Sequence, residues 1–269
     1  MSDDDDYVLG TEQDEIERLG LQHRVWRARM LDAWRRAGIG IGQTVIDVGA
    51  GPGYASADLA EIVGPGGRVV ALERSQRFLE ALEDRARRLK LGNIEAREHD
   101  VCAQSFGEDV ADAAWCRWLL SFVAEPQRTV CHIARALKPG GVAVFHEYAD
   151  YGAWQMMPRD PDVDRFRDLV MLSWRDAGGE PDVCLSLPQW LAAERLEVAE
   201  VRPLIEIVGR RDFAWQWPAA FMATNAHRLR ELGYVGEEEA HRLASALERV
   251  PAGALMVTPL VVEIVARKL

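Results

Sequence analysis

The sequence predicts an α/β protein built on a doubly wound, mostly parallel sheet. Between Gln43 and Ala149, short runs rich in β-branched residues alternate with longer amphipathic runs, which is typical of repeated βαβ units. Inside this stretch, the apolar run 44–48 leads directly into a glycine-rich turn at 49–53. A length of 269 residues and a hydrophobic content of 48% suffice for one such domain with additional helical segments.

The chain begins with an arm and a helix, residues 1–42. Thr11 can cap a helix over 11–37, in which apolar residues recur near helical spacing. Glu12 and Asp14 lie at its amino end, where negative charge favours the helix dipole. We expect this helix to lie across the main domain.

The core, residues 43–150, is expected to contain five strands with helices between them. Each strand is a short apolar run bounded by glycine, proline or polar residues, and the fifth follows the turn Lys138-Pro139-Gly140-Gly141. The expected strands are 44–48, 68–73, 93–100, part of 112–122, and 141–146.

Two further core segments are expected after residue 150, separated by insertions. Ser186 and Gln189 form a capping-box pattern that predicts a helix over 187–195, followed by a strand over 198–208. The roughly 45 residues before a last strand at 255–267 are predicted as helices, too long for a hairpin turn and suited to a lid or a dimerisation element. The predicted divisions are a cap insertion (151–185), a core helix and strand (186–211), a helical lid insertion (212–252) and the final core strand (253–269).

Composition excludes several classes of protein. A formal net charge of −11 disfavours a long surface that tracks nucleic-acid phosphates. No stretch approaches the ~18 consecutive apolar residues of a membrane span. The four cysteines lie far apart and the first residues, MSDDDDYVLG, do not resemble a secretion signal, so a cytoplasmic location is expected.

The glycine-rich turn favours an amino-acid-like ligand over a dinucleotide. Gly49, Gly51 and Gly53 would let the backbone approach a ligand closely. A dinucleotide-binding turn has the pattern GxGxxG, but the sixth position counted from Gly49 is Tyr54, which disfavours NAD. Asp47 places a carboxylate at the mouth of the turn, where it would repel a pyrophosphate and attract an ammonium group.

Acidic residues also end the next two strands. Glu73 ends the second strand, where a βα unit returns an acid beside the first turn and a carboxylate suits a ribose diol. The third strand ends in Asp100 and Val101, which are placed to meet an adenine edge.

At these residues the chain resembles the class I methyltransferases that depend on S-adenosylmethionine (SAM). The ordered motifs are DVGAGPG, Glu73, His99-Asp100-Val101 and LKPGG, and they cover roughly residues 43–148. The resemblance implies a seven-stranded sheet whose last strand inserts antiparallel beside the fifth, and SAM as cofactor. It also implies cofactor contacts: Asp47, Gly49 and Gly51 at the methionine end, Glu73 at the ribose hydroxyls, Asp100 and Val101 at the adenine, and Arg117 or Trp118 flanking the sulfonium.

The acceptor is expected over strands four and five, because ligands of open α/β sheets bind at the carboxyl ends of strands. His146 is the first candidate for a general base, Glu147 the second and Tyr148 the third. A base is optional, because positioning in a dry pocket can supply most of the acceleration. From the first helix region, Gln22, Trp26 or Tyr7 could contact the cofactor, and the cap offers Trp154, Met156, Met157, Trp174, Trp215, Trp217, Phe221 and Met222 to cover an acceptor.

The sequence therefore predicts a SAM-dependent methyltransferase acting on a small apolar or aromatic metabolite through an O-, N- or C-acceptor. The alternatives are a non-catalytic SAM-binding module and, less favoured, an NAD(P)-dependent oxidoreductase. No HExxH, paired CxxC or other metal-binding pattern is present, so no metal is expected. The aromatic cap could support a homodimer.

Overall fold

The computed structural model describes residues 9–269. It contains a seven-stranded sheet in the order β3-β2-β1-β4-β5-β10-β7. The first five strands of this order are parallel, and β10 pairs antiparallel with both β5 and β7. The strands are β1 Thr44–Val48, β2 Arg68–Glu73, β3 Ile94–Glu98, β4 Ala111–Arg117, β5 Leu137–Asp150, β6 Gln155–Met157, β7 Leu196–Leu204, β8 Ile207–Gly209, β9 Leu255–Val257 and β10 Leu260–Lys268. The predicted fold class is confirmed.

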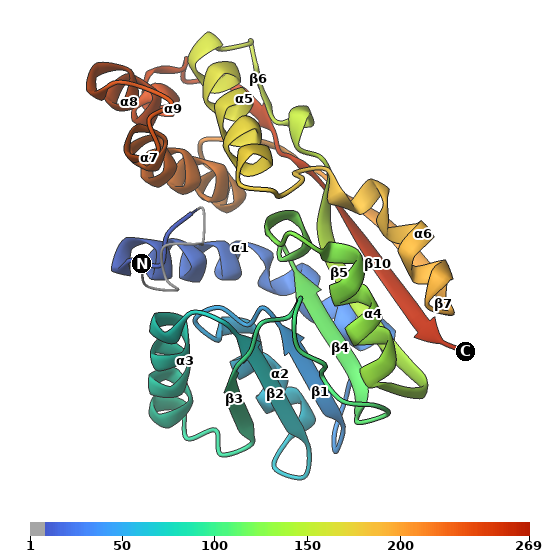
Figure 1. Cartoon of the computed structure of the whole chain (residues 1–269). Helices are drawn as coiled ribbons and strands as arrows, with labels where there is room; N and C mark the ends of the chain where they lie inside the picture. Colours follow the sequence, from blue (N-terminus) through green and yellow to red (C-terminus); the bar gives the residue numbers. More distant parts are fainter. Residues whose placement is uncertain (1–8) are drawn as a thin grey trace.

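Helices cover both faces of the sheet, and a separate group lies beyond one end of it (Figure 1). Helices α1 and α2 pack on one face, and α4 and α6 on the other. The separate group consists of α5, α7, α8 and α9. The helices are α1 Gln13–Ala37, α2 Tyr54–Val63, α3 Gln76–Leu89, α4 Pro126–Ala136, α5 Pro161–Asp176, α6 Leu187–Ala193, α7 Gln216–Glu231, α8 Glu237–Ala244 and α9 Ala246–Arg249.

Helix α1 links the two parts of the molecule. Its carboxyl half buries Met30, Ala33 and Trp34 against the sheet, while other α1 residues contact α7. The helix ends at Gly38, whose φ of 83° is the left-handed conformation that glycine adopts at helix ends. Its amino end differs from the prediction, because Glu12 is the N-cap and no side chain caps it.

The predicted strand over 255–267 is wrong in one respect: it is two strands in different sheets. β9 joins β6 and β8 in a three-stranded antiparallel sheet, whereas β10 belongs to the main sheet. Thr258 and Pro259 separate them, and proline cannot donate a ladder hydrogen bond. The predicted strand over 198–208 is divided in the same way, between β7 and β8.

The capping box predicted at Ser186 is also wrong. Ser186 has helical backbone angles and its side chain makes no capping hydrogen bond to α6, because the preceding 3₁₀ turn Val183–Leu185 leads straight into the helix. Within residues 9–269, no helix is long and apolar enough to cross a membrane.

Candidate functional site

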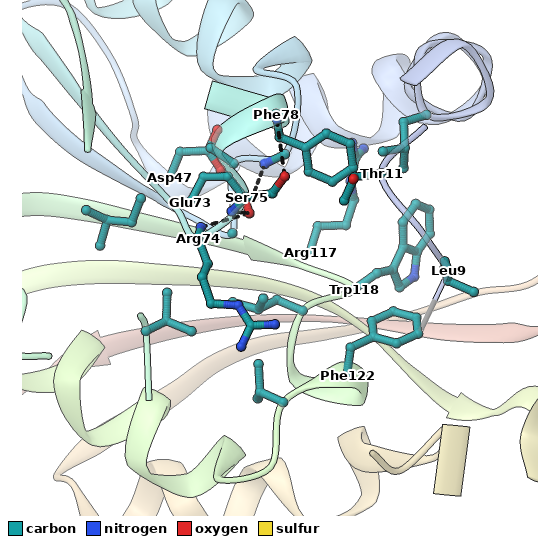
Figure 2. A pocket seen from close by; sticks show the side chains of 18 of the residues that line it. Leu9, Thr11, Asp47, Glu73, Arg74, Ser75, Phe78, Arg117, Trp118 and Phe122 are labelled. Carbon is teal, nitrogen blue, oxygen red and sulfur yellow. Dashed lines mark hydrogen bonds between the residues drawn. The ribbon is translucent and has the colours of Figure 1, made fainter. Parts of the chain in front are cut away.

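A cavity of about 610 Å³ opens at the carboxyl ends of β1, β2, β3 and β4. The cavity lining includes all of the cofactor contacts implied by the family resemblance, namely Asp47, Gly49, Gly51, Glu73, Asp100, Val101, Arg117 and Trp118. In Figure 2, Asp47 and Glu73 lie at one side of the cavity, Trp118 and Phe122 at the other, and Arg117 between them. The volume is typical of a small-molecule site.

The glycine-rich turn has a backbone that other residues would adopt only with strain. Gly49, Gly51 and Gly53 have φ values of 71°, 54° and 75°. A Cβ atom on Gly49 would also lie 2.7 Å from Cδ1 of Leu119. Glycine is thus required in this turn for its backbone angles and, at Gly49, for the close packing of Leu119, which follows β4.

Tyr54, at the position where a dinucleotide turn has its third glycine, serves the packing of helices. Its hydroxyl donates to the carbonyl oxygen of Ile16 at 3.1 Å, and the Arg85 guanidinium lies 3.5 Å from its ring centroid. The Tyr54 side chain therefore connects α2 to α1. In a dinucleotide-binding fold, a glycine at this position instead lets the helix pack closely on the strand.

Glu73 fastens the glycine-rich turn to the end of β2. One carboxylate oxygen accepts from the Gly51 amide at 2.8 Å, and the other accepts from the amides of Arg74 and Ser75 at 2.8 and 2.9 Å. Burial raises the pKa of Glu73, and these backbone hydrogen bonds oppose that shift. The sequence did not predict this structural role.

Asp47 and Arg117 present opposite charges to the same part of the cavity. Asp47 is buried and accepts a 2.6 Å hydrogen bond from the Ser56 hydroxyl. Burial raises the pKa of Asp47 to about 6, although the positive charge of Arg117 lowers it. The two side chains attract each other without forming an ion pair.

The Arg117 guanidinium makes no ion pair with any residue of the described chain, 9–269. It lies 5.8 Å from the Trp115 ring centroid and 5.1 Å from that of Trp118, and its Nη1 is 3.7 Å from the Met30 sulfur. Burial lowers the pKa of Arg117 to about 10, which leaves it charged at neutral pH. A mostly buried cation whose close contacts are two rings and a sulfur atom, with no ion pair to the described residues, favours a bound anion.

Asp100 shapes the loop that follows β3. Its Oδ1 accepts from the amides of Cys102 and Ala103 at 2.8 and 3.1 Å, which leaves its other oxygen available at the cavity. Val101 lines the cavity beside it and is 7% exposed.

Trp118 begins the other half of the cavity. Its φ of 47° is unusual for a bulky residue, and its amide donates to the His146 carbonyl oxygen at 3.0 Å. The strained backbone turns the indole into the cavity directly after β4. We call the following set the aromatic end: Arg18, Trp118, Phe122, Tyr148, Trp174 and Phe221.

His146, the first candidate base, does not line the cavity. It is fully buried, and its Nε2 lies 2.9 Å from Oε2 of Glu263, which also pairs with Arg36. Burial lowers the pKa of His146, so the imidazole is neutral and donates from Nε2. The ring of Trp26 lies against that of His146, 6.2 Å between centroids. His146 therefore joins β5 to β10 and cannot reach an acceptor in this cavity.

Glu147, the second candidate, faces the opposite side of β5 and supports the turn after β4. Its Oε1 accepts from the amides of Leu119 and Leu120 at 3.0 and 3.1 Å. Burial raises the pKa of Glu147 to about 7. It is absent from the cavity lining, and it positions the turn that packs against Gly49.

Glu147→Ala is expected to lower the free energy of unfolding by about 2–5 kcal/mol, because two buried amides lose their acceptor. Glu147→Gln keeps an acceptor oxygen and should cost less. The pKa of this carboxyl is higher in the folded chain than its ordinary 4.5, so stability from this group falls as pH rises from 4.5 to about 7. Urea unfolding of the wild type and Glu147→Gln across this range measures the difference. Parallel pH dependence of the two proteins would contradict this assignment.

The predicted cap residues divide between the cavity and the core, except Met157, which is exposed. Trp174 and Phe221 line the cavity, as does Gln22 of α1. Trp26 packs instead on Trp118, and Tyr7 lies outside the described residues. The cap residues that do not line the cavity are Trp154, Met156, Met157, Trp215, Trp217 and Met222.

Arg18 and Phe122 line the cavity but were not predicted. Arg18 is a buried residue of α1 that pairs with Glu15 and donates to Gln22 at 2.9 Å. The sequence did hold a signal for Arg18. It lies four residues before Gln22, so the two side chains share one face of the helix, and Gln22 was expected at the cofactor. Phe122 follows β4 in a short 3₁₀ turn, Leu120–Phe122, which carries no sequence pattern of its own.

Residues 46–145 match the sequence profile of the family described as "Methyltransferase domain". This segment is therefore similar to a methyltransferase domain. The chain has the class I methyltransferase fold, as predicted, and the matched segment contains the glycine-rich turn, Glu73, Asp100 and Arg117.

Known proteins resemble the methyltransferase domain and the fold around it. The ubiquinone/menaquinone biosynthesis C-methyltransferase UbiE of Escherichia fergusonii is 28% identical over 128 residues, 47% of this chain and half of UbiE. A Bacillus halodurans protein superposes with a TM-score of 0.62 at 15% identity, over 90% of this chain and 99% of the other. Geranyl diphosphate C-methyltransferase of Streptomyces coelicolor superposes with a TM-score of 0.58 at 16% identity, over 92% of this chain and 80% of that enzyme. At these identities the two structures establish the shared fold.

Proposed function

We propose that the whole protein transfers the methyl group of SAM to a small organic molecule bound at the aromatic end. The observation that carries this proposal is that Asp47 and Arg117 bring opposite charges to the cavity beside the glycine-rich turn and form no ion pair with each other. An α-amino acid carries an ammonium and a carboxylate, so these two side chains complement the methionine end of SAM. A pyrophosphate would face the Asp47 carboxylate and be repelled.

The proposed contacts revise one expectation from the sequence. Arg117 beside the sulfonium would place two positive charges together, so we assign its guanidinium to the SAM carboxylate. Asp47 takes the ammonium, Glu73 the ribose hydroxyls, Asp100 the adenine amino group and Val101 the adenine ring. SAM supplies an electrophilic methyl group on sulfur. The chain's own contribution is to hold both reactants in a dry cavity with the reacting atoms in line.

Glu73→Gln is expected to weaken binding of SAM and S-adenosylhomocysteine (SAH) by about 1–3 kcal/mol, because a neutral amide accepts more weakly from a ribose diol. Both oxygens of the Glu73 carboxylate accept hydrogen bonds from backbone N–H groups, whereas a Gln side chain has only one acceptor oxygen. The melting temperature of the variant should therefore fall modestly. Calorimetry and thermal unfolding measure the two effects. An unchanged SAH affinity would remove Glu73 from the ribose site.

Catalysis is tested by measuring SAH release from SAM with a panel of small aromatic phenols, amines and carboxylic acids. Acceptor-dependent SAH formation and a methylated product supported by mass spectrometry are expected. SAM binding without SAH formation for any acceptor would favour a SAM-binding module instead. A homodimer and a cytoplasmic location remain predictions from the sequence.

A further inference from the structure

The aromatic end contains two buried hydrogen-bond donors without acceptors. The indole N–H groups of Trp118 and Trp174 have no partner among the described residues, although the two residues are only 8% and 2% exposed. Both side chains line the cavity. Trp217, which stacks on Trp118, differs because its N–H donates to Gln22 at 3.0 Å. Buried donors normally have acceptors, so these two favour a ligand that brings one.

Tyr148 adds a third donor between these indoles. Its ring stacks on Trp118, with centroids 5.6 Å apart and planes 16° apart, and lies 6.0 Å from Trp174. No other side chain of residues 9–269 hydrogen-bonds its hydroxyl. Burial raises the pKa of Tyr148 well above its ordinary value, so the hydroxyl keeps its proton and can donate it to a hydrogen bond.

Two guanidinium groups lie at this end of the cavity. Arg18 lies 5.3 Å from the Phe221 ring centroid and Arg117 lies 5.1 Å from that of Trp118. Both charges act on the Tyr148 hydroxyl, lowering its pKa against the effect of burial, while the nearby Glu147 raises it. Arg18 forms an ion pair with Glu15, which partly neutralises its charge.

No described side chain of the aromatic end can take a proton at neutral pH. The carboxylates and the imidazole in the cavity lining belong to the ends of β1, β2 and β3 and to the start of α4. They are Asp47, Glu73, His99, Asp100 and Glu125. Methylation of a neutral hydroxyl or amine would therefore lack a base at the acceptor.

We infer that the acceptor is an acidic phenol that binds as its phenolate, with the ionised oxygen facing the Trp118, Trp174 and Tyr148 donors. This inference rests on the proposed methyl transfer. An oxygen–carbon bond forms as the methyl carbon–sulfur bond breaks, and the electron pair of the broken bond stays on sulfur. The negative charge of the oxygen and the positive charge of the sulfonium cancel, so no proton has to leave. A reaction in which two opposite charges neutralise each other is faster in a water-poor cavity than in water, because water stabilises the charged reactants more than the transition state.

The test uses 4-nitrophenol, whose neutral and ionised forms have different visible spectra. It is titrated into the full-length protein saturated with SAH, with 4-nitroanisole and 4-nitroaniline as probes that cannot form a phenolate. We expect the bound probe to show the phenolate spectrum at a pH where free nitrophenol is mostly neutral, and to bind about tenfold or more tightly than either control.

Variants assign the effect to the three donors. Trp118→Phe, Trp174→Phe and Tyr148→Phe should each reduce the preference for nitrophenolate over nitroanisole by about tenfold. Trp190→Phe, at a residue outside the cavity lining, should leave it unchanged. Binding of the neutral phenol, equal binding of the three probes, or no nitrophenol binding contradicts the inference. Failure of SAH itself to bind contradicts the proposed function.

Discussion

Arg117→Met is expected to weaken SAM and SAH binding by about 2–5 kcal/mol and to leave methylthioadenosine binding unchanged. Methylthioadenosine keeps the adenosine and the sulfur of SAH but lacks the amino-acid end, so it has no carboxylate for Arg117. Because the guanidinium makes no ion pair with the described residues, its loss should not destabilise the ligand-free fold. Calorimetry with the three ligands and thermal unfolding without ligand measure both effects.

Arg165→Met is the matched control for this variant. Arg165 lies on α5, is half exposed, and pairs with Glu239 away from the cavity. Its substitution should leave all three affinities unchanged. Equal weakening of SAH and methylthioadenosine by Arg117→Met would mean that Arg117 acts through the shape of the cavity. An unchanged SAH affinity would remove the assigned carboxylate contact.

SAH affinity of the wild type is expected to fall as pH drops below about 6, by up to tenfold per pH unit. Burial raises the pKa of Asp47 to about 6, so below that pH the ligand's ammonium meets a protonated, neutral carboxyl. Above it, Asp47 is ionised and affinity is full. Asp47→Asn should show weak binding with no such step. Calorimetric titration of both proteins over this pH range is the measurement.

Methylthioadenosine is the control for this pH dependence, because it has no ammonium group. Its affinity for the wild type should not show the step. A step of equal size for both ligands would place the titrating group at the adenosine end, and a flat SAH profile would contradict the role of Asp47.

The core of the fold was predictable because its signals are local. Alternating runs, positive-φ glycines at 49 and 51, and acids at strand ends each depend on a few neighbouring residues. The sheet of β6, β8 and β9 was not predictable, because three-residue strands from three distant segments carry no periodicity. Their pairing depends on tertiary contacts alone.

The cofactor end of the cavity was predictable and the acceptor end was not. His146 and Tyr148 alternate with Glu147 along β5, so their shared face follows from strand geometry. That Tyr148 reaches the cavity while His146 does not depends on tertiary packing, in which the His146 ring lies 4.8 Å from the Trp115 ring and 6.2 Å from the Trp26 ring. Neither the role of Glu147 beneath the turn nor the buried position of Arg18 follows from residue type.

Side-by-side calorimetric titration of the purified protein with SAM, SAH and NADH determines whether the cavity holds SAM. We expect saturable, one-to-one binding of the two adenosyl amino acids and none of NADH, because Asp47 repels a pyrophosphate and Tyr54 replaces the third glycine of a dinucleotide turn. Binding of NADH without SAM or SAH would contradict the methyl-transfer account.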